Sequence, residues 1–465
     1  MNALFKTQPS GAANTPASAR PARHAQALLA ALIGSALCAP VWALDLSQAY
    51  QAALLQDATL RGTQAATAAK HERLPQTRAQ LLPSLSFSAS RNRNALVSDT
   101  HNFLGNPVTT NSNYTSSSEA LTLKQPLFRA YQRADYRQAQ AQVEDADALL
   151  ERELQNVGVR VSGAYFEALL TAEQLALVLA QKSAYTSQLD AAKKRFAAGS
   201  GTRTDIDEAQ AALDMNVAQE LEARQDVDYT RRQLQTLVNQ PIDHLATLDP
   251  AKMVLLPPSP ERLEDWTERA ETSSPEMRAL RAQLEAARME VEKAKAGHLP
   301  TLDAVAQWSR TESDTVTSVN NRYTNKSIGL QLNVPIFSGG YVNSLVRQAL
   351  AEQERAEQAL EALRRDLGVR VHREFRGVTE GVLKVKALEQ AVRSSGQVAL
   401  SNQRSYEAGS RTLIDTLNAE QQKVQAQRDL AHARFIYLIS RVRLQALTGG
   451  AKTDIIDQIN GWLTP

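Results

Sequence analysis

Residues 408–415 read Ala-Gly-Ser-Arg-Thr-Leu-Ile-Asp, and residues 198–205 read Ala-Gly-Ser-Gly-Thr-Arg-Thr-Asp. The two stretches share Ala, Gly, Ser, Thr and Asp at equivalent places, 210 residues apart. The same offset relates residues 158–161 to residues 368–371, which both read Gly-Val-Arg-Val. A constant offset over a long stretch is the mark of an internal repeat. The chain is therefore predicted to consist of two copies of one unit.

Proline spacing divides each copy into two kinds of segment. No proline occurs between Pro126 and Pro241, or between Pro335 and Pro465. Both spans carry apolar residues at steps of three and four, as in the series Val157, Val161, Tyr165, which is the spacing of a narrow coiled-coil seam. A helix over 130–196 would be about 100 Å long at 1.5 Å per residue. These spans therefore predict long paired helices that turn at residues 199–201 and 409–410.

The segments near the early prolines alternate with a period of two. Leu85, Phe87 and Ala89 alternate with serines, and Ile328, Leu330 and Leu332 alternate with Ser, Gly and Gln. This alternation predicts strands that are apolar on one face only. Each pair of strands encloses a polar loop, expected at about 98–113 and 313–323. The chain is thus expected to be mainly α-helical, with four strands of 9–11 residues, the length that crosses a bilayer.

The N-terminus has the pattern of a secretion signal. A basic lead is followed by an apolar run from Ala25 and by the small-residue pattern Val41-Trp42-Ala43. Cleavage after Ala43 would remove three basic residues, so the formal charge would fall from +2 to −1. Nucleic acid is therefore not an expected partner. Residues 35–38 weakly resemble a lipoprotein box around Cys38, which remains a second interpretation.

Catalytic and metal-binding motifs are not found. The seven His residues form no HxxxH or HExxH pair, and the single Cys excludes a cysteine zinc cluster. The chain contains no GxSxG motif, and Gly199-Ser200-Gly201 lacks the Gly-Lys-Ser/Thr of a phosphate-binding loop. Beyond the signal no run of 18 apolar residues suggests a transmembrane helix. We therefore expect no enzyme activity, no metal and no cofactor.

Four strands are too few for a closed barrel, which needs about eight. An open sheet edge cannot stand in lipid, so membrane-spanning strands would have to be pooled by several chains. A soluble β-tip on a helical rod remains the alternative.

The sequence resembles the TolC family of outer-membrane exit ducts over essentially the whole mature chain. The resemblance rests on the duplicated unit, on Leu82-Pro83 and Leu299-Pro300, on residues 125–128 and 334–340 after the return strands, and above all on residues 406–415. It implies a homotrimer whose twelve strands form one outer-membrane β-barrel in contact with lipid, and whose long helices form a periplasmic α-barrel. It also implies a periplasmic adaptor protein and, through it, an inner-membrane transporter of the ABC or RND type.

The repeat, the proline spacing and the resemblance together predict a signal peptide at 1–43, an equatorial linker at 241–275 and a C-terminal equatorial segment at 449–465. The first repeat, 44–240, is expected to contain a helix, a hairpin at 84–125, a long helix, a tip turn at 199–203 and a helix. The second repeat, 276–448, is expected to contain a helix, a hairpin at 301–334, a long helix, a tip turn at 409–412 and a helix.

The resemblance also assigns roles at the two tip turns. Asp205, Tyr406 and Arg411 match the residues that link neighbouring coils and hold the periplasmic end closed. Asp415 matches a ring of carboxylates that favours cations, and Asn418 stands where a second ring is often found. The tips themselves, with Gly199, Ser200, Gly409 and Ser410, are expected to dock the adaptor. A surface ion pair without function is the plain alternative for the gate residues.

The function expected from these observations is a passive exit duct. Its cargo is either a protein of a type I secretion system, which the resemblance favours slightly, or small molecules leaving by efflux. The alternative is a periplasmic coiled-coil scaffold or adaptor without a pore, which would not need alternating hairpins.

Overall fold

The computed structural model describes residues 43–314, 320–450 and 453–464. The predicted signal peptide, apart from Ala43, and the centre of the second hairpin's loop lie outside these residues. From Leu44 onward the chain forms one compact unit. All statements below concern this unit.

Short helices precede each hairpin. The first repeat begins with α2 (Leu46–Gln56), α3 (Ala58–His71) and α4 (Arg73–Ala79). Before the second hairpin, α7 (Leu263–Ser273) lies in the predicted linker, and α8 (Pro275–Lys295) is followed by a single 3-10 turn (Ala296–His298). The expectation of one helix before the first hairpin is therefore wrong. Asp57 breaks it, because its carboxylate accepts the N–H of Leu60 and so caps a new helix.

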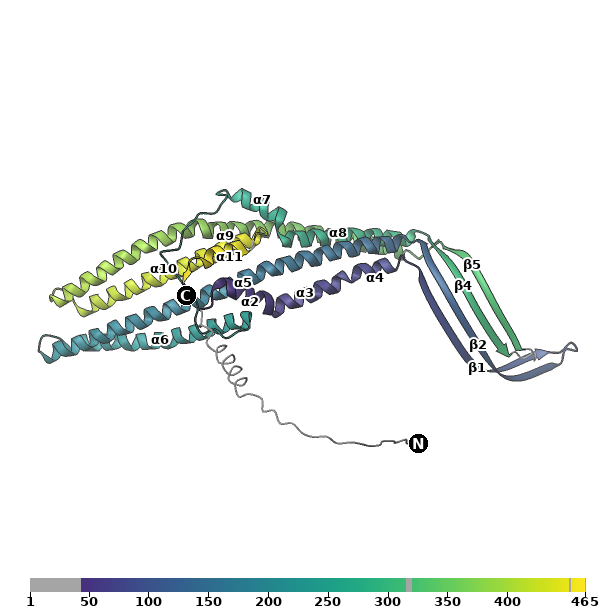
Figure 1. Ribbon diagram of the computed structural model, residues 1–465, viewed down its shortest axis with the longest axis horizontal. Helices are drawn as coiled ribbons and strands as arrows, with labels where there is room; N and C mark the ends of the chain where they lie inside the picture. Colours follow the sequence, from purple (N-terminus) through teal and green to yellow (C-terminus); the bar gives the residue numbers. More distant parts are fainter. Residues whose placement is uncertain (1–42, 315–319, 451–452, 465) are drawn as a thin grey trace, which may run out of the picture. The chain divides into compact units, whose positions relative to one another are not determined.

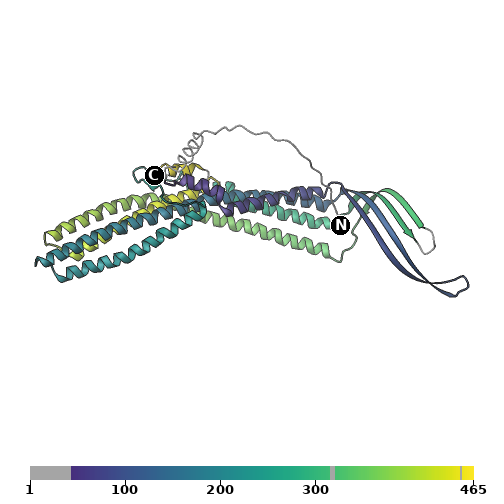
Figure 2. The ribbon, with the colours of Figure 1, turned by 60° about the horizontal axis from the view of Figure 1, so that its bottom comes forward.

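The four long strands form one antiparallel sheet. They are β1 (Ser84–His101), β2 (Pro107–Phe128), β4 (Thr301–Asp314) and β5 (Asn320–Asn333), in the order β1-β2-β4-β5. The two hairpins are joined because β2 pairs with β4, with Leu123 opposite Ala306. Figures 1 and 2 show this sheet at one end of the helical part. Both repeats thus contribute to one continuous wall.

The strands are longer than expected. β1 has 18 residues and β2 has 22, and their pairing continues to His101 opposite Pro107. The expected loop at 98–113 is therefore wrong, since only a short turn around Gly105 separates the strands. In this part of the hairpin both faces carry Ser, Thr and Asn, so no alternation signals a strand. Cross-strand bonds such as that from Thr109 to Asp99 maintain the pairing.

Two pairs of long helices follow the hairpins. The first pair is α5 (Ala130–Ala197) with α6 (Arg203–Val238), and the second is α9 (Tyr341–Glu407) with α10 (Leu413–Leu447). Val157, Val161 and Tyr165 of the expected seam are fully buried, and their counterparts in α9 are buried as well. At Gly377 of α9 an added Cβ would lie 2.6 Å from the Ser440 hydroxyl, so glycine permits the close approach of α10. The long helices are thus held by apolar seams and close backbone contact.

The segments between and after the repeats contact one another. β3 (Thr247–Leu248) pairs with β6 (Leu463–Thr464), and α11 (Thr453–Asn460) packs against α2. The Tyr165 hydroxyl lies 3.0 Å from the Leu44 carbonyl oxygen and 2.8 Å from that of Ala246. Burial of this hydroxyl raises its pKa. These contacts join the linker, the C-terminal segment and α5.

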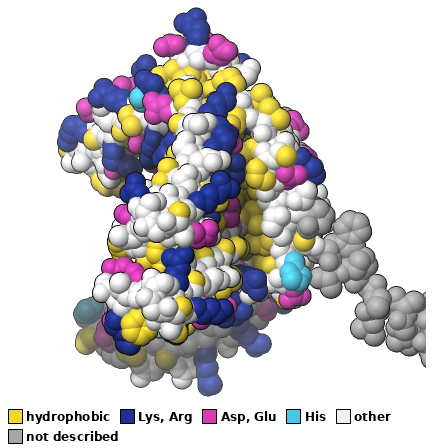
Figure 3. All heavy atoms as spheres, turned by 90° about the vertical axis from the view of Figure 1, so that its left-hand side faces the viewer, with side chains coloured by type: hydrophobic (Ala, Val, Ile, Leu, Met, Phe, Trp, Pro, Cys, Tyr) yellow, Lys and Arg dark blue, Asp and Glu magenta, His cyan; other side chains and the backbone are white. Residues whose placement is uncertain are grey.

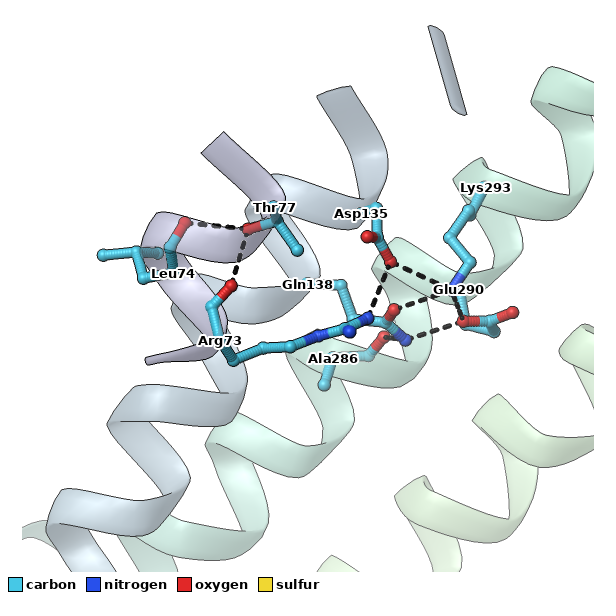
Figure 4. Close-up of polar contacts among 8 residues, drawn as sticks. All are labelled: Arg73, Leu74, Thr77, Asp135, Gln138, Ala286, Glu290 and Lys293. Atoms are coloured by element: carbon cyan, nitrogen blue, oxygen red, sulfur yellow. Dashed lines mark hydrogen bonds and ion pairs between the residues drawn. The ribbon is translucent and has the colours of Figure 1, made fainter. Parts of the chain in front are cut away.

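A buried polar network holds α8 against α5 and α4 (Figure 4). Asp135 of α5 is 4% exposed, and both Lys293 of α8 and Arg73 of α4 contact its Oδ1 at 3.3 Å. Lys293 also contacts Glu290 at 2.8 Å, and Gln138 donates to Glu290. Burial raises the pKa of Glu290, but the hydrogen bonds from Lys293 and Gln138 lower it by more, so the pKa of Glu290 lies below its usual value. The paired charges let polar groups stay inside the helix bundle.

A second ionic cluster lies where the sheet meets the helices. Asp303, near the start of β4, is 4% exposed. Its carboxylate accepts from Arg129, which directly precedes α5, at 2.9 Å (Nε) and 2.5 Å (Nη2). Lys124 of β2 approaches the same carboxylate at 3.0 Å. The cluster therefore joins the second hairpin to the end of the first hairpin and the beginning of α5.

Candidate functional site: the two helical turns

The candidate site lies at the two interhelical turns, at the end of the helical part away from the sheet (Figure 1). Figure 3 views this end and shows Lys and Arg side chains interspersed with acidic, polar and apolar ones. No group of three or more His, Cys, Asp or Glu able to hold a metal occurs among the described residues. The site is therefore considered as an arrangement of charged and polar side chains on helix ends.

The four predicted docking residues close the turns. Gly199 has φ +72° and Gly409 has φ +76°, the left-handed conformation that glycine adopts without strain. The Ser200 hydroxyl donates to the Arg195 carbonyl oxygen at 3.2 Å, and the Ser410 hydroxyl donates to that of Ser405 at 3.0 Å. Both repeats therefore end their long helix in the same way.

Asp205 and Asp415 have the same local role. Each follows a threonine N-cap by three residues and forms a reciprocal capping box with it. The Thr412 hydroxyl donates to Asp415 at 2.7 Å, and the Thr202 N–H donates to Asp205 at 3.0 Å. Hydrogen bonds from Thr412, aided by the charge of Arg411, lower the pKa of Asp415. The Thr-x-x-Asp pattern of the repeat is thus a helix start.

Removing one cap is expected to loosen the second turn. The change Thr412→Ala removes the hydroxyl that caps α10, which is expected to cost about 1 kcal/mol of stability. Thr412→Ser keeps the hydroxyl and should cost much less. Urea unfolding of the purified protein followed by circular dichroism measures both. Equal stability of the Ala and Ser variants would contradict the capping role.

An apolar cluster joins the two turns within one chain. Its buried members are Tyr185, Leu189, Ala192, Ala209, Leu413 and Leu417. They come from α5, α6 and α10, and Tyr406 packs against them from α9. The two hairpins of helices therefore hold each other at this end.

This cluster predicts a contrast between two neighbouring residues. Leu413 is 1% exposed and Ile414 is 41% exposed. Leu413→Ala should destabilise the protein by about 2–4 kcal/mol, because it leaves a cavity. Ile414→Ala should cost well below about 1 kcal/mol in the isolated chain. Equal losses in urea unfolding would show that the cluster does not join the turns.

The structure adds Arg195 to the site, which the sequence analysis missed. Its guanidinium lies 4.3 Å from the centre of the Tyr406 ring, and its Nη1 lies 3.4 Å from the Tyr406 carbonyl oxygen. This is cation–π geometry. Arg195 is 211 residues from Tyr406 in sequence. The local signal at Arg195 is a basic residue in the last turn of a helix, which suits the helix dipole but does not indicate a contact with Tyr406.

Asp205, Tyr406 and Arg411 are not joined to one another within one chain, as far as the described residues go. Asp205 bonds to its cap, Tyr406 contacts Arg195, and Arg411 approaches Asp415 at 3.9 Å. The Arg411 side chain is 56% exposed. Any link from Asp205 to Tyr406 or Arg411 would therefore have to run between chains.

A groove of about 420 Å³ runs between α6 and α10 near the turns. Its lining includes Gln219, Asn418 and Gln425. The Asn216 Oδ1 and Arg428 Nε in its wall are buried and have no hydrogen-bond partner. The groove is therefore lined in part by amide side chains, with two unpaired polar atoms buried in its wall.

The sheet has one apolar face. Exposed residues on it include Leu85, Phe87, Ile328, Leu330 and Leu332. The opposite face carries Ser, Thr, Asn and Gln. This is the alternation of a membrane β-barrel wall.

Among the described helices, α5 contains an 18-residue window apolar enough to span a membrane, by length and composition only.

Comparisons with known proteins agree with this architecture. Residues 49–240 and 266–450 match the family described as outer membrane efflux protein. The chain is 33% identical over 411 residues to the alkaline protease secretion protein AprF of Pseudomonas aeruginosa, covering 88% of this chain and 85% of that protein. It is 30% identical over 424 residues to the proteases secretion protein PrtF of Dickeya chrysanthemi, covering 90% and 91%.

The fold is also that of a solved outer membrane protein. The structure of VceC from Vibrio cholerae matches with a TM-score of 0.74 and 19% identity, covering 88% of this chain and 97% of that one. The long helices and the four-stranded sheet are thus a known arrangement. The chain belongs to the outer membrane efflux protein family, the family of TolC, and is an outer-membrane channel protein that extends into the periplasm.

Proposed function

We propose that the protein is a homotrimeric exit duct that exports a protein substrate by type I secretion. The proposal rests on the sheet of four strands, which has one apolar face and two open edges. Open edges are not tolerated in lipid, and three chains would supply twelve strands for one closed barrel. The long helices would continue this barrel as a periplasmic tube.

The choice of cargo rests on two relatives. AprF and PrtF are both named as protease secretion proteins, and each matches most of this chain. Small-molecule efflux is the second candidate, because the matching family is described by efflux. The duct performs no catalysis in this proposal. The energy for export would come from an inner-membrane transporter of the ABC or RND type.

The turns would serve as gate and docking point. In the trimer, Asp205 of one chain would face Tyr406 or Arg411 of the next and hold the periplasmic end closed. An adaptor would contact the tips, with Gly199, Ser200, Gly409 and Ser410. This is supported by the absence of such links among the described residues of one chain and by the exposure of Arg411.

The test is the mass of the protein extracted from outer membranes in mild detergent, measured by light scattering corrected for detergent. Three chains per particle are expected. Loss of the gene should also abolish export of the cognate protein, and the gene in trans should restore it. A monomer that remains soluble without detergent would overturn the duct and favour the periplasmic scaffold.

Asn418 supplies a further prediction about the gate. It is exposed, about one helical turn beyond Asp415 in α10. Asn418→Asp would add a second ring of three carboxylates, so block by a multivalent cation should strengthen. Current through single channels in a planar bilayer measures this block, with Asn418→Gln as the uncharged control. Equal block in both variants would contradict the placement of Asn418 at the constriction.

A further inference from the structure

The apolar face of the sheet ends abruptly in charged residues. Along β4 the apolar stretch from Leu302 to Trp308 is about 20 Å long at 3.3 Å per residue, which corresponds to a height of about 15 Å at the usual tilt of a barrel strand. From the end of this stretch onward, cross-strand pairing defines three successive rows on the same face, each with one residue from β1, β2, β4 and β5 in that order. The first row is Phe87, Leu121, Trp308 and Lys326. The second is Ala89, Glu119, Arg310 and Thr324, and the third is Arg91, Ser117, Glu312 and Arg322. Arg93 lies one row further along β1.

We call Arg91, Arg93, Arg310, Arg322 and Lys326 the outer basic band. At the same height the opposite face carries uncharged residues, which are Ser90, Asn92, Ser116, Ser118, Ser309, Thr311, Tyr323 and Asn325. The charges are therefore confined to the face that continues the apolar belt. A requirement for solubility alone would place charges on both faces.

The outer basic band has an excess of positive charge. Glu312 and Arg322 form a two-pronged pair at 3.0 and 3.1 Å. Among the described residues, Arg91, Arg93, Arg310 and Lys326 have no ion-pair partner within the chain. The three rows contain four basic residues, which are Arg91, Arg310, Arg322 and Lys326, and two acidic ones, Glu119 and Glu312, which leaves two positive charges in excess per chain.

The position of the band follows from the localisation. The helices extend into the periplasm, so rows further along the strands from the helices lie nearer the cell surface. The outer basic band therefore lies where the lipid tails of the outer leaflet give way to headgroups. Arginine guanidinium groups bind phosphate oxygens by paired hydrogen bonds, and they do so more strongly near lipid than in water.

We propose that the outer basic band is a binding site for the phosphate groups of an anionic lipid in the outer leaflet. The apolar rows beneath it contact the acyl chains of the same lipid, while Arg91, Arg93, Arg310 and Lys326 contact its phosphates. The inference needs only that the strands cross the outer membrane. It does not depend on the cargo or on the gate.

The experiment uses the full-length protein, purified in mild detergent and stripped of lipid. Native mass spectrometry then measures retention of a bisphosphorylated glycolipid, lipid A, against the same lipid without phosphates. Each basic residue near an anionic lipid contributes roughly fivefold to binding. We expect the phosphorylated lipid to bind at least about tenfold more tightly. The variant Arg91→Gln/Arg93→Gln/Arg310→Gln/Lys326→Gln should lose that preference.

Two further variants separate charge from folding. Arg91→Lys/Arg93→Lys/Arg310→Lys keeps the charge and should retain the phosphate preference. Arg355→Gln/Arg365→Gln/Lys384→Gln/Lys386→Gln removes four exposed charges from α9 and should leave binding unchanged. Unchanged lipid preference in the band variant, or none in the wild type, would overturn the proposal. Particle mass and channel conductance report separately on the proposed duct.

Discussion

Replacing Arg411 by alanine is expected to raise the open probability of the reconstituted channel by up to about 100-fold. Each exposed ion pair contributes about 0–1 kcal/mol, and a trimer contains three copies of the link. Their sum reaches about 3 kcal/mol, and every 1.4 kcal/mol shifts a two-state equilibrium about tenfold. The change also removes the cation that lies 3.9 Å from Asp415 in each chain. Three less compensated carboxylates would then repel one another at the constriction.

The measurement is single-channel conductance in a planar bilayer, together with antibiotic leak in cells. Arg203→Ala is the matched control. Arg203 lies on the first turn and pairs with Asp207 at i,i+4, as Arg411 pairs with Asp415. It should leave the conductance unchanged. If Arg411→Ala also changes neither conductance nor leak, Arg411 is a surface charge and the proposed gate is wrong.

Replacing Asp303 by alanine is expected to destabilise the protein by about 2–4 kcal/mol. Asp303 is buried, and its loss leaves Arg129 and Lys124 facing each other without a counter-charge. Removing one partner of a buried ion pair typically costs about 3–5 kcal/mol, and the partial exposure of Lys124 reduces this. The substitution is expected to weaken the contact between the sheet and the beginning of α5, which positions the sheet on the long helices.

Urea unfolding followed by circular dichroism measures the loss. Glu285→Ala is the control, because Glu285 pairs with Arg288 on an exposed helix surface. That change should stay within about 0.5 kcal/mol. A double variant, Asp303→Ala with Arg129→Met, should regain part of the stability, since it also removes the uncompensated charge. Equal stability of the Asp303 and Glu285 variants would show that the junction does not depend on the ionic cluster.

The sequence by itself determined the repeat, the long helices and the presence of four strands. Proline-free spans and steps of three and four depend only on local backbone preferences, so they can be recognised without a partner. The turns were equally local. Gly199 and Gly409 provide positive φ, and Thr202 and Thr412 with their aspartates provide capping boxes. The candidate gate residues came from the resemblance, and their role stays a prediction.

The tertiary structure decided which distant residues meet. Arg195 contacts Tyr406 and Arg129 pairs with Asp303 because helices and strands far apart in sequence lie side by side, which no local pattern encodes. Further along α5, Ala172, Ala176 and Leu179 continue the steps of three and four but are exposed in the chain, while Val178 and Tyr185 are buried. A repeat near 3.5 residues drifts around a helix of 3.6 residues per turn, so the buried face must be set by the neighbouring helices. The strand register likewise placed five basic residues on one face, because cross-strand pairing aligns side chains from separate strands.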